Sequence, residues 1–153
     1  MKTIKPGSRV VRSVQLDRAT LNQDTRTIEL AFSSEEPYER WFGIEILSHE
    51  PGAIRMHRIA SGSAPLLRDH ENSIESQVGV IESATVGADR RGRAFVRFGK
   101  SEDDEAIYQK VLDKIISNVS VGYIVHEAKL ISTDKKGVDT FLVTDWEPLE
   151  ISL

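Results

Sequence analysis

The chain has 153 residues, of which 39% are apolar and 29% are charged, and it contains no cysteine. This length fits one domain with its own core, and the lack of cysteine excludes a disulfide framework, a thiolate zinc site and a cysteine nucleophile. The 20 basic and 24 acidic side chains leave a net charge of −4, which gives no electrostatic case for binding nucleic acid or an anionic membrane. No apolar run approaches the ~18 residues of a membrane-spanning helix. We therefore expect a single soluble domain over residues 1–153 that binds neither nucleic acid nor membrane.

The first half of the chain reads as strands separated by polar turns. Residues 1–20 are expected to form an N-terminal arm that joins a sheet. Residues 25–32 alternate, with Ile28, Leu30 and Phe32 on one face, which is the pattern of a half-buried strand. A polar loop over 33–41 and an extended segment over 42–47 follow. Residues 77–85 and 93–98 are predicted strands, joined by a hairpin turn at 89–92.

One helix is predicted, over about 101–117. Ser101 is placed to cap it, with Asp104 three residues later, and acidic side chains complement the dipole of its first turn. Asn118 is the expected stop. The apolar stripe at helical spacing consists of Ile107, Val111, Leu112, Ile115 and Ile116.

The remaining segments are again strands, predicted over 119–125, 138–144 and 149–153, with a turn at 134–137. Strands outnumber helices, and turn signals recur every 8–15 residues. We therefore predict a mainly β fold with helices (α+β), a closed or nearly closed antiparallel β-barrel flanked by helices. The last strand is followed by no polar tail, so we expect a C-terminal tail to be absent or trimmed.

Four histidines are the side chains whose ordinary pKa lies near neutrality. His49 and His57 lack a third ligand at a suitable spacing, so we expect loop or packing residues and no metal or cofactor. His126 is expected to face solvent. His70 follows Asp69 at the end of an apolar run, and the pattern fits either a solvated Asp–His pair or a catalytic base.

Ser120 is distinguished by its position in an apolar strand directly after the predicted helix. A small hydroxyl there packs, bonds a neighbouring carbonyl, or attacks a substrate. The last role requires a base within ~2.6–3.2 Å and a third group that orients this base. His70 and one acid among Asp145, Glu147 and Glu150 could supply them, although the residues alone allow many other triads.

A resemblance narrows these choices. Several segments, in this order, resemble the prohead (procapsid maturation) proteases of tailed bacteriophages, which are related in fold to the herpesvirus assemblins. The most specific of them are the Leu-Leu-x-Asp-His segment that ends at His70 and the Asn-Val-Ser-Val-Gly-Tyr segment around Ser120. The resemblance covers roughly residues 15–153, and its segments are 26–28, 33–43, 64–70, 78–80, 91–94 and 116–123.

The resemblance implies a serine endopeptidase without cofactor or metal. It makes Ser120 the nucleophile, His70 the general base and Glu150 the orienting acid, with Glu147 and Asp145 as reserves. The mechanism would be acyl transfer through an acyl-enzyme, in which a carboxylate stabilises the imidazolium.

The implied function is cleavage of scaffold or capsid-protein extensions, and of the protease itself, during phage procapsid maturation. The partners would be a capsid or scaffold substrate and other copies of the chain, and the location the host cytoplasm, inside the assembling procapsid. An alternative is a catalytically silent assembly or scaffold-binding barrel of the same family. A further alternative is an unrelated hydrolase that uses Asp69 and His70 with a water nucleophile or a metal.

Overall fold

The chain folds into one large β-sheet with one helix among the described residues. The computed structural model describes residues 4–153, apart from the side chains of residues 14, 15, 17 and 18. The elements in chain order are β1 (Ser8–Asn22), β2 (Thr27–Ser33), β3 (Tyr38–Arg40), β4 (Gly43–Leu47), β5 (Pro65–Leu67), β6 (Gln77–Val86), β7 (Gly92–Phe98), α1 (Glu102–Leu112), β8 (Asn118–Thr133) and β9 (Asp139–Ser152).

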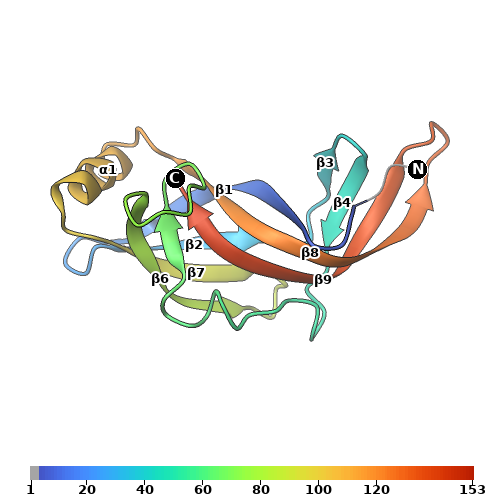
Figure 1. Cartoon of the computed structure of the whole chain (residues 1–153), viewed down its shortest axis with the longest axis horizontal. Helices are drawn as coiled ribbons and strands as arrows, with labels where there is room; N and C mark the ends of the chain where they lie inside the picture. Colours follow the sequence, from blue (N-terminus) through green and yellow to red (C-terminus); the bar gives the residue numbers. More distant parts are fainter. Residues whose placement is uncertain (1–3) are drawn as a thin grey trace.

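The sheet runs in the order β3-β4-β9-β5-β6-β7-β2-β1-β8, and β8 pairs with β9 as well. The two longest strands, β8 and β9, form an antiparallel hairpin from Ser120↔Ser152 to Thr133↔Asp139. Strand β9 also pairs in parallel with β4 and with β5. Figure 1 shows α1 at one end of the elongated molecule, and the β8–β9 turn with β3 and β4 at the other end.

The alternation of inward-facing and outward-facing residues along the strands shows which side chains form the core. Ile28, Leu30 and Phe32 of β2 are fully buried, as their spacing predicts. The largest buried side chain is that of Trp146 in β9, whose indole packs edge-on against Tyr123 of β8. These residues join one continuous core under the sheet.

The predicted fold class is wrong. Among the described residues there is one helix, not a set of flanking helices. The sheet is not the antiparallel barrel that we expected, because β9 pairs in parallel with both β4 and β5. Parallel pairing joins segments far apart in the sequence, so the local turn signals that led to the barrel prediction do not reveal it.

The predicted strands are found, although several have different bounds. The arm joins the sheet as β1, while residues 1–3 of the predicted arm lie outside the described part. Strand β3 lies inside the predicted loop 33–41. The two strands predicted over 138–144 and 149–153 are one strand. Pro148 lies opposite Tyr123 beside a register shift, where the regular ladder of hydrogen bonds is interrupted and a residue without an N–H is tolerated.

Helix α1 begins as predicted but ends early. Ser101 is the N-cap, and its hydroxyl accepts a hydrogen bond from the backbone N–H of Asp104. The helix ends at Leu112, with Asp113 as its C-cap, and Lys114 has a left-handed backbone with φ of 62°. Ile115 therefore leaves the predicted stripe and is 71% exposed. No helix in the described residues is long and apolar enough to cross a membrane.

The helix packs through Val111, which is fully buried in the core. We expect Val111→Ala to lower the free energy of unfolding by about 1–3 kcal/mol, because it leaves a cavity beneath the helix. Ile115→Ala is the matched control and should change it by less than about 0.5 kcal/mol. Denaturant titration measures both. Equal losses would show that the helix does not pack through the Val111 face.

Candidate functional site

The turn after β5 brings His70 against the last strand. Asp69 and His70 both have left-handed backbones, with φ of 52° and 57°, which non-glycine residues rarely adopt in succession. The end of β9 holds this turn, because the N–H of Asp69 donates to the Leu153 carbonyl and the N–H of His70 donates to the Ser152 hydroxyl. A turn strained in this way and fixed from outside is a typical feature of functional sites.

The side chain of Glu150 is the centre of the site. Its carboxylate is 2% exposed and lies 2.6 Å from Nδ1 of His70. The same oxygen accepts from Arg9 of β1 at 2.9 Å, and the other accepts from the Ser152 hydroxyl at 2.8 Å. A buried carboxylate needs such partners, since an unpaired one would be strongly destabilising. Gly122 makes room for it, because a Cβ atom there would lie 2.1 Å from Oε1 of Glu150.

The structure therefore brings together His70 and Glu150, two of the three residues assigned to the triad. Ser120 is half-buried on β8, directly opposite Ser152 of β9 and Ser13 of β1. Among the described residues no hydrogen bond joins its hydroxyl to His70.

The reserve acids have other partners. Asp145 forms two hydrogen bonds with the guanidinium of Arg55, at 2.7 and 2.8 Å. Glu147 lies 3.3 Å from Nε2 of His126, which is therefore paired at the surface. Within the described residues no group of three or more His, Asp or Glu side chains could hold a metal ion.

Sequence reasoning missed Arg9 and Ser152. Ser152 could have been found, because it lies two residues after Glu150 in an alternating strand and so shares its face. Arg9 lies 141 residues from Glu150 in the sequence, and no local pattern connects the two.

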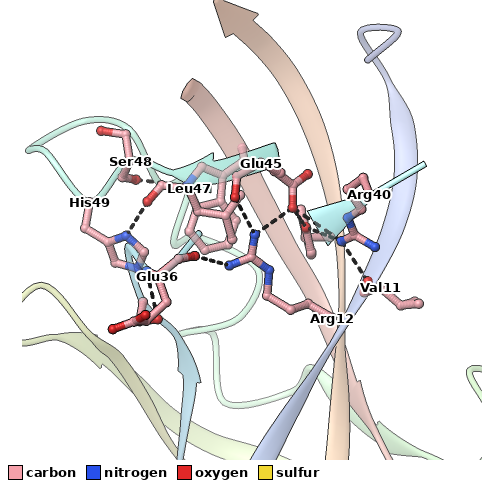
Figure 2. A network of polar contacts seen from close by, with 11 residues as sticks. Val11, Arg12, Glu36, Arg40, Glu45, Leu47, Ser48 and His49 are labelled. Carbon is pink, nitrogen blue, oxygen red and sulfur yellow. Dashed lines mark hydrogen bonds and ion pairs between the residues drawn. The ribbon is translucent and has the colours of Figure 1, made fainter. Parts of the chain in front are cut away.

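A second polar cluster, also missed, lies beneath β3 and β4 (Figure 2). Glu45 is fully buried, and its Oε1 atom is 2.7 Å from Nη2 of Arg12 and 3.3 Å from Nη2 of Arg40. The Tyr123 hydroxyl donates to the same oxygen, and Arg40 also donates to the Val11 carbonyl. Burial, and then the nearby Glu45 carboxylate, raise the pKa of Tyr123 well above its ordinary value, so this phenol stays protonated.

His49 continues this cluster toward β2. Its Nδ1 lies 2.9 Å from the Leu47 carbonyl, which only accepts, so Nδ1 carries the proton. Nε2 then accepts from the Ser33 hydroxyl at 2.8 Å. The prediction of a packing residue is confirmed for His49, which also touches the Trp146 ring.

Burial lowers the pKa of His49 below its ordinary value near 6.5, although the Leu47 carbonyl and Glu35 act in the opposite direction and Arg12 and Arg90 reinforce the shift. The folded state therefore binds fewer protons at this residue than the unfolded state, and stability is lost as the pH falls through 6.5. We expect His49→Gln to flatten the decline in unfolding free energy between pH 7 and pH 5. His57→Gln, at an exposed position, should keep it. An unchanged slope in His49→Gln would contradict this assignment.

Comparison with known proteins gives one relative. The chain is 44% identical over 126 residues to the protein named major capsid protein of Halomonas phage phiHAP-1. The match covers 81% of this chain but only 20% of the relative, so the chain spans about one fifth of that protein's length. No family model matches the chain, and no solved structure does.

This finding overturns the functional prediction. The relative is named a major capsid protein, not a prohead protease, so the assignment to the protease family is wrong. The prediction of a serine endopeptidase acting on scaffold or capsid extensions, and on itself, is corrected with it, and so is the predicted substrate partner. The alternative of a silent scaffold-binding barrel of that family has no support either. What remains of the prediction is the similarity to a protein of a bacteriophage.

Proposed function

We propose that this chain is a structural β-domain of a phage capsid polypeptide and that it contributes to the shell together with other copies of itself. The observation that carries the proposal is the 44% identity, over 126 residues, with a phage major capsid protein. The proposed location is accordingly the phage particle or the assembling capsid.

The fold supports this role. The hairpin of β8 and β9 extends over most of the elongated molecule (Figure 1). Buried ion pairs join β1, β3 and β4 beside this hairpin. The elements of the domain are thus linked both by sheet pairing and by the ion pairs of Arg12 and Arg40 with Glu45.

The test is a chimera. The matching segment of the phiHAP-1 capsid protein is replaced by residues of this chain, and the product is expressed in a bacterial host and viewed by electron microscopy. We expect closed shells. The matched control is the same chimera with Glu45→Ala, which disrupts the domain and should abolish assembly. Shells that form equally well with the control, or with the segment deleted, would overturn the proposal.

The roles assigned to Ser120, His70 and Glu150 stay predictions. For Glu150 alone we propose a role here, which is that its carboxylate orients the ring of His70. The 2.6 Å contact supports this role, because a carboxylate that accepts from Nδ1–H fixes the tautomer with Nε2 unprotonated. Nitrogen NMR of the His70 ring is the measurement. We expect Glu150→Gln to shift the tautomer population and Glu147→Gln to leave it unchanged. The same spectrum for both variants would contradict the role.

A further inference from the structure

The end of the molecule opposite α1 carries an apolar surface, which we call the arm-end surface and define by Trp41, Phe42, Leu130 and Val138. The Trp41 side chain is 75% exposed, and Leu130 and Val138 are also exposed. Phe42 is half-buried and links them, since its ring packs against those of Trp41 and Phe141. Phe141 lies opposite Leu130 in the β8–β9 register.

This surface is concave and held in place. A cavity of about 510 Å³ is lined by residues 39–44 and by residues 137–139. Its two walls are fixed together by the parallel pairing of β4 with β9 and by Gly43, where a Cβ atom would lie 2.3 Å from the Asp139 carbonyl oxygen. Exposed aromatic side chains on a preorganised surface are typical of the residues that dominate protein interfaces.

The charges around the arm-end surface suit a second copy of the same chain. Residues 127–139 contain three acidic and three basic side chains, a local net charge of zero in a chain of net charge −4. The basic Lys135 and Lys136 stand beside the acidic Asp134 and Asp139 in this turn, so two copies related by a twofold axis can place opposite signs together. The opposite end has four acidic residues in the first turn of α1, which would repel a like surface.

We propose that two copies of the chain associate through their arm-end surfaces, in a twofold contact centred on Trp41. The inference rests on the proposed function, which requires copies of the chain to associate, and it specifies the surface that they use.

Sedimentation velocity of the isolated chain, from 1 to 500 µM, tests the inference. We expect a concentration-dependent monomer–dimer equilibrium. Trp41→Ser should raise the dissociation constant at least tenfold, and so should Lys135→Glu with Lys136→Glu, which makes both surfaces acidic. Ile74→Ser is the matched control, because Ile74 is 88% exposed but lies outside the arm-end surface, and it should leave the equilibrium unchanged.

A chain that stays monomeric at 500 µM would overturn the inference, and so would an equal loss of association in Ile74→Ser. A thermal midpoint that is unchanged in Trp41→Ser shows that the variant is folded. The chimera separates this result from the proposed function: shells that form from chimeras carrying Trp41→Ser would refute the arm-end contact and leave the structural role standing. If the isolated chain forms dimers but the chimera forms no shells, the proposed structural role would be refuted and the arm-end contact would stand.

Discussion

Glu45→Ala is expected to lower the free energy of unfolding by roughly 3–5 kcal/mol, because it leaves the buried guanidinium of Arg12 and the half-buried one of Arg40 without their counter-charge. Arg12 is 5% exposed and Glu45 is fully buried, so water cannot take over the lost interaction. The hydroxyl of Tyr123 loses its acceptor at the same time. Denaturant titration at pH 7 measures the change.

Two further variants make the result specific. Glu45→Gln keeps the shape and one acceptor oxygen but removes the charge, so we expect an intermediate loss. Asp145→Ala breaks an exposed ion pair with Arg55, and it should leave the denaturation midpoint nearly unchanged. If Glu45→Ala were as mild as Asp145→Ala, the cluster in Figure 2 would not stabilise the fold.

Trp146→Ala should lower the free energy of unfolding by about 3–5 kcal/mol, because it leaves a cavity in the core. The indole is fully buried between Tyr123 and His49, and its N–H donates to the Ser48 carbonyl at 3.0 Å. Trp41→Ala is the matched control and should change stability by less than about 0.5 kcal/mol, because that indole is largely exposed.

Trp146→Phe keeps an aromatic ring but no N–H group, so its loss of stability should lie between those of Trp146→Ala and Trp41→Ala. Thermal unfolding followed by circular dichroism gives all three values. A Trp41→Ala variant less stable than Trp146→Ala would contradict the placement of the core beneath β8 and β9.

The sequence predicted the local elements well where alternation and turns specify them. Strand β2, the hairpin of β6 and β7 and the cap at Ser101 all follow from short-range patterns. The sheet order does not, because the parallel pairings of β9 with β4 and β5 connect segments about 85–100 residues apart, which no local periodicity records.

In the candidate site, too, some residues could be identified from local sequence patterns and others could not. Glu150 could be selected because it faces one side of an alternating strand and needs a partner there, and the structure places it against His70. The cluster of Arg12, Glu45 and Arg40 could not be identified from the sequence, since it depends on three strands that meet in space. Glu45 reads in the sequence as an ordinary strand residue on a polar face.

The resemblance to phage proteases shows the limit of short motifs. The segments around His70 and Ser120 pointed to the biology of a phage capsid, and the relative is a phage capsid protein. They did not establish the activity, because a histidine beside a buried acid also serves as a structural pair that fixes a strained turn.

Quantitative mass spectrometry of purified shells assembled from the chimeric capsid polypeptide tests the structural role most directly. The ratio of peptides from the inserted segment to peptides from the rest of the polypeptide is measured against isotope-labelled standards. A structural domain stays in the shell, so the predicted ratio is one to one. Shells that form but lack the inserted segment would contradict the account.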